Sequence, residues 1–297
     1  MNNQSPPTVF HPGEIAVQQR AGVREQARRL VGMLGSPDLD GGPSKFLSTR
    51  DFAALAGRDE NALLWVSPLS GQPGFLAAGN TTLRIAAPPV PGDPLHRIPS
   101  GQPIGLIAMD FAARRRMRIN GTLTSVTADG LSIDVDQAYG NCPKYIHQRD
   151  LTPNSPDSAA GRFRYETELS ADDAALIAAS DTFFLGTTHG EQSRDASHRG
   201  GPAGFVRVSD ANTVWWPDYP GNNMFNSLGN LATDDTAALL FIDFATGSTL
   251  QLSGVAEVVW GTAGAPGDDG GVGRRVRFTV QHTARGHAQA YAGRSEE

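Results

Sequence analysis

The chain has 297 residues, of which 39% are hydrophobic and 19% are charged, a composition typical of a globular protein and not of a disordered one. Its net charge of −6 makes nucleic acid an unfavourable general partner, because a phosphate backbone would repel it. The single cysteine, Cys142, excludes an internal disulfide and a cysteine-cluster zinc site, and the 34 glycines and 20 prolines favour many short strands joined by turns.

Two features of the sequence bear on location. The first ten residues, MNNQSPPTVF, contain no basic region followed by an apolar stretch, so they predict no signal peptide. The longest apolar stretches, such as Ala237–Ile242, are far too short to span a bilayer. We therefore expect a soluble cytoplasmic protein without a membrane partner.

The N-terminal half predicts two helices followed by strands. Residues Glu14–Leu34 combine strong helix formers with spaced apolar side chains, and Gly35-Ser36-Pro37 ends that helix. A second short helix is expected at Arg50–Ala56, with Thr49 as its N-cap. The strands predicted after it are Leu63–Ser67, Thr82–Ala86, Ile104–Phe111, Met117–Leu123 and the alternating segment Leu131–Val135.

A linker is predicted at Asp150–Arg162, which is rich in Pro, Ser, Asp and Ala. We accordingly expect one domain over residues 1–155 and a second over residues 156–297. The second begins with a capping box at Ser170 and Asp173, which starts a helix ending near Ala179. Its predicted strands are Thr182–Thr187, Gly204–Val208, Val214–Trp216, Ala237–Phe244, Leu250–Val259 and Arg275–Val280, with a glycine-rich loop at Thr262–Gly273.

An internal repeat relates the two halves. The segment IGLIAMDFAARRRMRING (104–121) aligns without gaps to AALLFIDFATGSTLQLSG (237–254). Two upstream segments, Gly71–Phe75 and Pro91–Leu95, match Gly201–Phe205 and Pro220–Met224 in the same order. The repeat predicts a duplication in which the first half lacks a counterpart of EQSRDASHRG and the second half lacks one of Tyr139–Tyr145. The identical pairs are Leu106/Leu239, Asp110/Asp243, Phe111/Phe244, Ala112/Ala245 and Gly121/Gly254.

Two polar segments of the second half carry candidate binding chemistry. Asp195–Gly201 (DASHRGG) lies between two predicted strands and can grip an anion, because arginine binds phosphate in a bidentate manner and glycines let backbone N–H groups approach. Its alternative is a solvated hairpin loop. Pro220–Asn230 (PGNNMFNSLGN) begins with a turn and continues into a short helix whose amides and serine can bind phosphate or hydroxyl groups; its alternative is an Asn-rich capping turn.

Other motifs have a plainer interpretation. The run Arg114–Arg116, followed by Arg118, is either a solvated hairpin tip or a grip on a dinucleotide phosphate. Cys142 and Lys144 can flank a reactive site, although a lone cysteine is ordinarily a small core residue. No histidine pair has metal-ligand spacing, and the chain contains no hydrolase, P-loop or Rossmann motif. We predict no metal site, and the catalytic residues stay unknown.

The segments DASHRGGPAGFVRV, Trp-Trp-Pro-Asp, PGNNMFNSLGNL and LLFIDF…LQLSG, in this order, resemble the pyridoxamine 5′-phosphate oxidase-like FMN-binding split-barrel superfamily. The segments FHPGE, QQRAGVRE, PGF, PGDPL, IGLIAMDF, RRRMRINGT and QAYGNCPKYI resemble the leading half of its two-repeat subfamily. The resemblance implies a mainly β fold, with two tandem split β-barrels of six strands, peripheral helices, and an intramolecular pseudo-dimer.

The resemblance also implies one composite FMN site, with the phosphate on the second repeat and the first repeat near the flavin ring. FAD, a deazaflavin or haem are the other cofactors considered. The Trp…Arg-Leu-His signature of true pyridoxamine phosphate oxidases is absent, so vitamin B6 synthesis is not expected. The cofactor-binding residues implied are Ser197, His198, Arg199, Gly200, Gly221, Asn222, Asn223, Ser227 and Asn230 of the second repeat and Asn141, Cys142 and Lys144 of the first.

The leading functional hypothesis is a flavin-dependent oxidoreductase that takes electrons from NAD(P)H, from a separate reductase or from its small-molecule substrate. The alternative is a non-catalytic protein that binds flavin or haem for storage, sensing or delivery. A third hypothesis is a degenerate scaffold with an empty pocket. The expected assembly is a pseudo-dimeric monomer, with a homodimer as the alternative.

Overall fold

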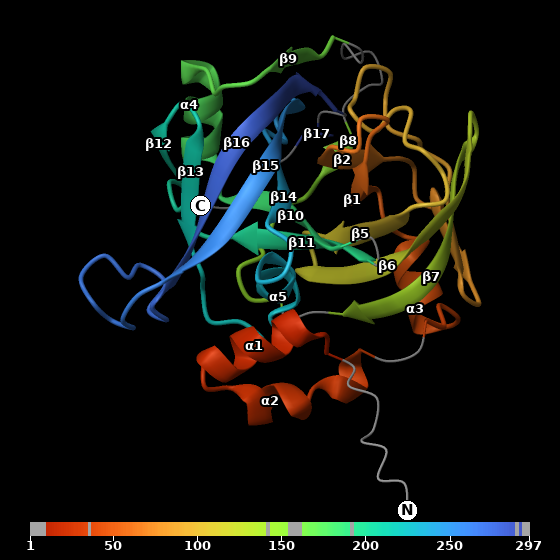
Figure 1. Ribbon diagram of the computed structural model, residues 1–297. Helices are drawn as coiled ribbons and strands as arrows, with labels where there is room; N and C mark the ends of the chain where they lie inside the picture. Colours follow the sequence, from red (N-terminus) through yellow and green to blue (C-terminus); the bar gives the residue numbers. More distant parts are fainter. Residues whose placement is uncertain are drawn as a thin grey trace, which may run out of the picture.

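Two antiparallel sheets of the same design dominate the structure (Figure 1). The computed structural model describes residues 10–34, 37–140, 143–153, 162–190, 193–288 and 291–292. The main path of each sheet contains seven strands, one more than the six expected of each barrel. The prediction of a mainly β fold is confirmed.

The N-terminal sheet has the strand order β2-β1-β5-β6-β7-β4-β3. Its central strands are almost entirely apolar because both of their faces are covered, whereas β7 alternates between buried and half-exposed or exposed positions. The strands of this sheet are β1 (Phe52–Arg58), β2 (Leu64–Ser70), β3 (Leu76–Gly79), β4 (Thr82–Ile85), β5 (Pro103–Asp110), β6 (Arg115–Thr127) and β7 (Gly130–Gly140).

The C-terminal sheet has the order β11-β10-β14-β15-β16-β13-β12, with β9 paired to β16 off this path. A separate small ladder joins β8 to β17. The strands are β8 (Thr152–Pro153), β9 (Arg164–Glu166), β10 (Thr182–His189), β11 (Ser193–Gly200), β12 (Arg207–Asp210), β13 (Thr213–Pro217), β14 (Thr236–Ile242), β15 (Ser248–Trp260), β16 (Arg274–His287) and β17 (Tyr291–Ala292).

The two strand orders are identical once β1–β7 are matched in sequence to β10–β16. The register supports the same match, because Leu55 lies opposite Leu106 and Leu185 lies opposite Leu239. Both long hairpins also carry a β-bulge, one at Gly121 and one at Gly254. The gap-free alignment of residues 104–121 to residues 237–254 therefore matches structurally equivalent positions.

The helices lie at the margins of the sheets. Helix α1 is shorter than the predicted Glu14–Leu34, because Gly22 has a positive φ of 71° and ends the helical path soon after Arg20. Helix α4 confirms the predicted capping box, in which the Ser170 side chain accepts from the Asp173 backbone N–H. The helices are α1 (Pro12–Arg20), α2 (Arg24–Arg28), the 3₁₀ helix η1 (Val31–Met33), α3 (Gly42–Leu47), α4 (Ala171–Ala179) and α5 (Asn226–Leu231).

The predicted helix at Arg50–Ala56 is wrong. Phe52–Arg58 is strand β1, and the preceding helix is α3. The segment is rich in alanine, which favours a helix, but β1 lies between β2 and β5 with its alanines fully buried on both faces. Tertiary packing has overridden the local preference.

The polar segment Ser193–Gly200 was not recognised as a strand, yet it forms the buried strand β11. Its partner β10 pairs with it along the whole length. The N-terminal sheet has an equivalent strand, β2, so the prediction that the first half lacks a counterpart of this segment is wrong. Smaller errors include the unpredicted strands β3 and β9 and the start of strand β12, which begins at Arg207 instead of Gly204.

The two sheets pack against each other through a shared hydrophobic core. The core joins apolar residues of β1, β2 and β5, such as Phe52, to those of β10, β11 and β14, such as Phe184, and also contains Phe111 and Phe244, which follow β5 and β14. Strand β11 lies across β5 and β6, and its counterpart β2 lies across β14 and β15. The contacts between the halves are thus reciprocal, since the equivalent strand of each half lies across the equivalent two strands of the other. Each sheet also has a separate core of its own.

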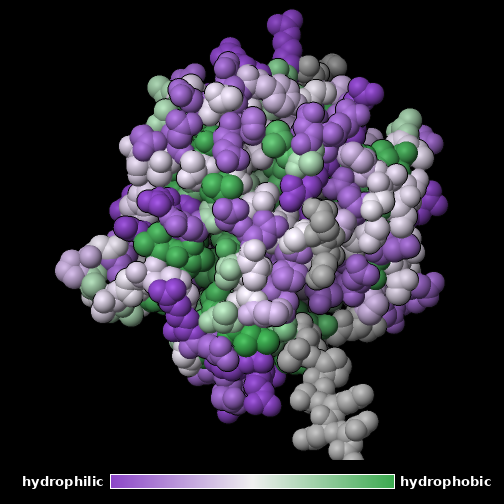
Figure 2. Space-filling model, viewed as in Figure 1, coloured by the Kyte–Doolittle hydropathy of each residue, from purple (hydrophilic) through white to green (hydrophobic). Residues whose placement is uncertain are grey.

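The surface shown in Figure 2 is mostly hydrophilic, with hydrophobic atoms in several places, among them beside the base of the β15–β16 hairpin. No helix in the described ranges is long and apolar enough to cross a membrane. Most of the predicted linker, residues 154–161, lies outside the described residues. The domain boundary at residue 155 stays a prediction.

Candidate cofactor-binding site

A cavity of about 260 Å³ opens between the two halves; we call it the interface cavity. Strand β6 and the segment after β7 contribute its N-terminal side, and β11, the segment after β13 and α5 contribute the rest. Its lining residues are Arg116, Arg118, Lys144, Tyr145, Ser197, His198, Arg199, Gly200, Phe205, Leu228 and the segments 216–223 and 225–227.

Nine of the twelve predicted cofactor-binding residues line this cavity. Asn230 does not line it; it lies one turn further along α5, where its amide donates to Thr187 Oγ1 at 2.9 Å. Asn141 and Cys142 lie outside the described residues. The nine residues that the structure brings together are Lys144, Ser197, His198, Arg199, Gly200, Gly221, Asn222, Asn223 and Ser227.

The cavity is strongly cationic. Among the described residues, four cationic side chains line it against one acidic side chain, Asp218. Arg116, Arg118 and Lys144 come from the N-terminal half and only Arg199 comes from β11. The positive charge of the site therefore depends mainly on the half that does not contain the predicted phosphate motifs.

Arg118 makes a buried ion pair with Asp195 of β11. The two residues are 5% and 3% exposed, so the pair connects the halves in a medium where charge is poorly screened. Asp195 also accepts a hydrogen bond from Ser227 Oγ at 3.1 Å, and the same hydroxyl lies 3.1 Å from Ser197 Oγ. One carboxylate thus holds lining groups from β6 and α5 in place beside β11.

Arg199 is held more loosely. Its nearest acidic partner is Asp218 at 3.8 Å, and Asp218 is already paired with Arg274 at 2.9 Å. The Arg199 Nε is buried but has no hydrogen-bond partner in the part of the chain that is described. Burial lowers the pKa of Arg199, and Asp218 opposes that change. A guanidinium with an unused inward donor is suited to bind an anion.

His198 is neutral. Burial lowers its pKa well below the ordinary value, and the nearby guanidinium groups of Arg116 and Arg149 lower it further. Its Nδ1 lies 3.2 Å from Arg116 Nη1, and its buried Nε2 has no hydrogen-bond partner in the described chain. His198 therefore adds an uncharged imidazole and no further positive charge.

Two stacked tyrosines form the aromatic side of the cavity. The rings of Tyr145 and Tyr219 are 5.2 Å apart and inclined by 23°, and Tyr145 Oη donates to Pro220 O at 3.0 Å. Gly200 permits this arrangement, because a Cβ there would lie 2.0 Å from the Tyr145 carbonyl oxygen. The glycine was predicted to let backbone N–H groups reach a phosphate, but in the structure it admits the chain of the other half.

Backbone strain is concentrated at the same place. Tyr145, Asn223 and Phe225 line the cavity and have φ values of 73°, 62° and 62°, in the left-handed region that non-glycine residues rarely adopt. Such conformations cost about 1–3 kcal/mol each and persist where the surrounding structure imposes them, often at functional sites. The Asn222 side chain helps to impose this path by accepting from Met224 N at 3.1 Å.

Sequence reasoning missed the contribution of Arg116 and Arg118. The run of arginines that begins at Arg114 was interpreted mainly as a solvated hairpin tip, and Arg114 does lie at the turn, with a φ of 52°. Alternation along β6 then turns Arg116 and Arg118 toward the cavity, while Arg115 lies over the Phe46 ring. The period-two spacing of Arg116 and Arg118 was the signal that could have identified them.

The repeat places a counterpart of the interface cavity on the other side of the molecule. By strand register, Gln251 is equivalent to Arg118, and Ser67 is equivalent to Ser197. Asp93 is equivalent to Asn222, because its side chain also accepts a hydrogen bond from the backbone N–H two residues later, that of Leu95. Here Gln251 Nε2 donates to Ser67 Oγ at 2.9 Å and to Asp93 Oδ2 at 3.1 Å. The three side chains are at most 4% exposed. They contact one another in the place where the interface cavity has open space.

Comparison with known protein families finds a match in the C-terminal half. Residues 169–268, about a third of the chain, match the family model described as pyridoxamine 5′-phosphate oxidase. The predicted resemblance is confirmed, and the two sheets of equal strand order are consistent with a tandem arrangement. Comparison with curated proteins gives no match.

Several solved structures are similar to parts of the chain. HupZ of group A Streptococcus has 14% identity and a TM-score of 0.33, over 42% of this chain and 98% of its own. A protein related to general stress protein 26, from Clostridium acetobutylicum, has 15% identity and a TM-score of 0.30, over 42% and 92%. A FAD-binding protein from Mesorhizobium loti has 13% identity and a TM-score of 0.30, over 42% and 99%.

Proposed function

We propose that this protein binds one FMN in the interface cavity and acts as a flavin-dependent oxidoreductase. The family match of the C-terminal half supports a flavin. The observation that carries the choice of FMN is the cationic cluster, in which Arg199 has a buried Nε without a partner. A phosphate monoester carries about −1.5 to −2 charges at pH 7 and offers several acceptor oxygens, which such a cluster can bind.

The residues present fit this cofactor. Arg199 and Arg116 would donate to the phosphate, and the Ser197 and Ser227 hydroxyls, fixed beside Asp195, would complete the polar end. The stacked Tyr145 and Tyr219 give the cavity an aromatic wall suited to a flat ring system. When bound, the flavin would supply hydride or electron transfer, so the protein needs no nucleophile of its own.

The absorption spectrum of the purified protein, followed by titration of the colourless protein with FMN, tests the proposal. We expect a flavin spectrum, or saturable quenching of FMN fluorescence, at one equivalent per chain. Protein that neither carries a flavin nor takes up added FMN would show that the cavity serves something else. Anaerobic addition of NADH or NADPH then tests the oxidoreductase: bleaching of the flavin supports it, and an unchanged spectrum favours a protein that stores or delivers flavin.

One observation favours a second candidate, a haem-binding protein. His198 lines the cavity, is uncharged, and presents a buried Nε2 without a partner, which are properties of a haem ligand. The same spectrum separates the two, because haem gives an intense Soret band that a flavin lacks. His198→Ala should abolish a haem spectrum while leaving a flavin spectrum in place.

A further inference from the structure

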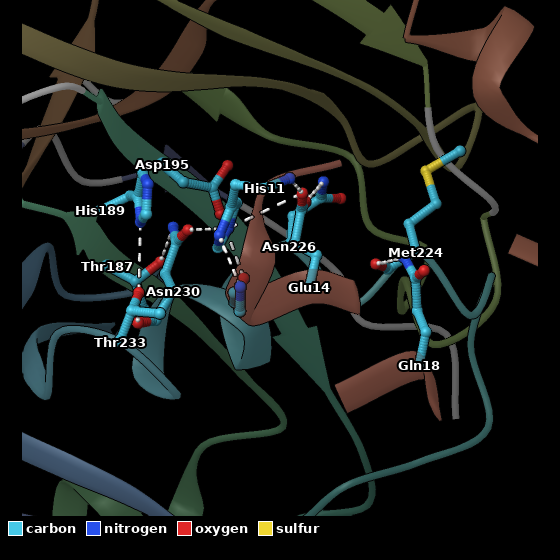
Figure 3. A network of polar contacts seen from close by, with 12 residues as sticks. His11, Glu14, Gln18, Thr187, His189, Asp195, Met224, Asn226, Asn230 and Thr233 are labelled. Carbon is cyan, nitrogen blue, oxygen red and sulfur yellow. Dashed lines mark hydrogen bonds and ion pairs between the residues drawn. The ribbon is translucent and has the colours of Figure 1, made fainter. Parts of the chain in front are cut away.

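Helix α1 is packed against the part of α5 that forms a wall of the interface cavity (Figure 3). The two backbones touch, because a Cβ added at Gly13 would lie 2.1 Å from the carbonyl oxygen of Gly229. Farther along α1, Gln18 Nε2 donates to Met224 O at 2.9 Å. A helix near the start of the chain therefore fixes the wall of a site more than two hundred residues away in the sequence.

Glu14 makes the contact closest to the cavity. Its Oε1 accepts from Asn226 Nδ2 at 2.6 Å, and its Oε2 accepts from the backbone N–H of His11 at 2.8 Å. Asn226 lines the interface cavity and also a second, polar cavity of about 370 Å³ behind it. Glu14 is 5% exposed and is thus a buried carboxyl one hydrogen bond from the proposed cofactor.

His11 holds this arrangement without a charge. Its Nδ1 accepts from Gly13 N at 3.2 Å, so the ring proton is on Nε2, which donates to Asn230 Oδ1 at 3.0 Å. Burial, together with the stacked ring of His189, lowers the pKa of His11 to about 4. Ionisation near neutral pH must therefore come from the carboxyl of Glu14 and not from this imidazole.

The groups around Glu14 oppose one another. Its pKa is raised to about 7, mainly by burial and to a smaller extent by the charge of Asp195. The hydrogen bonds from His11 and Asn226 and the charge of Arg118 act in the opposite direction. The charged and titratable groups that face it are His11 on its own helix, Arg118 of β6, Asp136 of β7, His189 of β10 and Asp195 of β11.

We propose that Glu14 is a positioning residue for the interface cavity, and that it couples cofactor binding to the uptake of a proton. Glu14 orients the Asn226 amide, and it places its charge behind the Arg118–Asp195 ion pair that faces the cavity. An anionic phosphate in the cavity favours the neutral carboxyl, and by linkage the neutral carboxyl favours the phosphate. The inference rests on the proposed function, because its ligand is FMN.

The pH dependence of FMN affinity in matched variants tests the inference. Glu14→Gln keeps the size and hydrogen-bonding reach of the side chain but cannot ionise. Glu25→Gln is the control, since Glu25 is an exposed residue of α2 that pairs with Arg28. Dividing the wild-type Kd by the Glu14→Gln Kd at each pH removes the titration of the FMN phosphate itself, which the variants share.

We expect this ratio to rise about fivefold between pH 6 and 8, which is the change for a carboxyl with a pKa of about 7 when binding raises that pKa by about one unit. For Glu25→Gln the same ratio should stay constant. A constant ratio for Glu14→Gln as well, whatever its absolute affinity, would overturn the inference.

A measurement on the wild type covers the case in which Glu14→Gln does not fold. The chain has nine glutamates, so ¹³C-carboxyl labelling of glutamate gives a spectrum simple enough to follow each titration. The midpoint of Glu14 should rise when FMN is added, and an unchanged midpoint in FMN-bound protein would contradict the proposed coupling. If the wild type binds no FMN at any pH, the proposed function has failed, and this coupling fails with it.

Discussion

The interface cavity and its counterpart occupy equivalent places in the two repeats but have opposite characters. One presents Arg118, paired with Asp195, beside an open cationic space, whereas the other joins Gln251 to Ser67 and Asp93 in a closed network. The backbone of the duplicated hairpin is the same in both, down to the bulge. The two halves share this backbone frame and differ in a few polar side chains, which is why we expect one ligand per chain instead of two.

Of the variants that test this comparison, Asp195→Ala should lower the stability of the protein most. It leaves the buried charge of Arg118 without its partner, which typically costs about 3–5 kcal/mol of unfolding free energy. Urea denaturation of the variant beside the wild type measures the loss. Gln251→Ala at the counterpart removes a neutral group, so it should lower the unfolding free energy by less. An equal decrease in the two variants would mean that the ion pair contributes no more to stability than the neutral network.

The shared frame is tested by Gly121→Ala and Gly254→Ala. A Cβ would lie 2.2 Å from Asp134 O at the first bulge and 2.0 Å from Thr279 O at the second. Relieving either clash requires a backbone shift, and we expect each variant to lose about 2–3 kcal/mol by urea denaturation. The two losses should be similar. Tolerance at one position alone would show that the bulges are not equivalent.

Arg199→Ala should weaken FMN binding without an equal loss of stability. Removing one charge-assisted contact typically costs about 1.5–3 kcal/mol, or roughly tenfold to a hundredfold in Kd. Fluorescence titration measures the change. Arg277→Ala is the matched control, because Arg277 is an exposed strand residue that is paired with Glu257 and does not line the cavity. Unchanged affinity in Arg199→Ala would refute the placement of the phosphate.

The smallest effect concerns pH and the closed counterpart. Burial raises the pKa of Asp93 to about 6, so the folded state binds this proton more tightly than the unfolded chain. The resulting stability is present in full at low pH and is lost as the pH rises from about 4 through 6, by about 1–3 kcal/mol. Asp93→Asn should remove this dependence in denaturation curves between pH 4 and 7. If Asp93→Asn keeps the pH dependence of the wild-type unfolding free energy, that dependence comes from another group.

Sequence reasoning succeeded where the structure depends on neighbouring residues or on the repeat. The Ser170–Asp173 capping box, the period-two segment at Leu131–Val135 and the paired hairpins are properties of short windows. It failed at β1, where alanine favours a helix and only burial between β2 and β5 makes a strand. It failed again at β11, whose polar residues suggest a loop until Arg118 and Ser227, from distant segments, satisfy them.

The candidate site shows the same division. The resemblance named nine residues that now line one cavity, because those residues lie in continuous motifs. It did not name Arg116, Arg118 or Tyr145 as binding residues, because their places in the cavity depend on how one half packs on the other. The role of Glu14 was also hidden, since its contact with Asn226 joins residues 212 positions apart.

The packing of α1 against α5 has a consequence for biosynthesis. Helix α1 is translated before the surface that Gly13 contacts at Gly229, which belongs to the last of the segments around the cavity. At about 5–20 residues per second, the interval between the two is on the order of 10–40 s. Until then the side of α1 that carries Glu14, Val17 and Gln18 lacks its contacts with residues 224–231. This wall of the cavity can therefore form only after most of the chain has been synthesised.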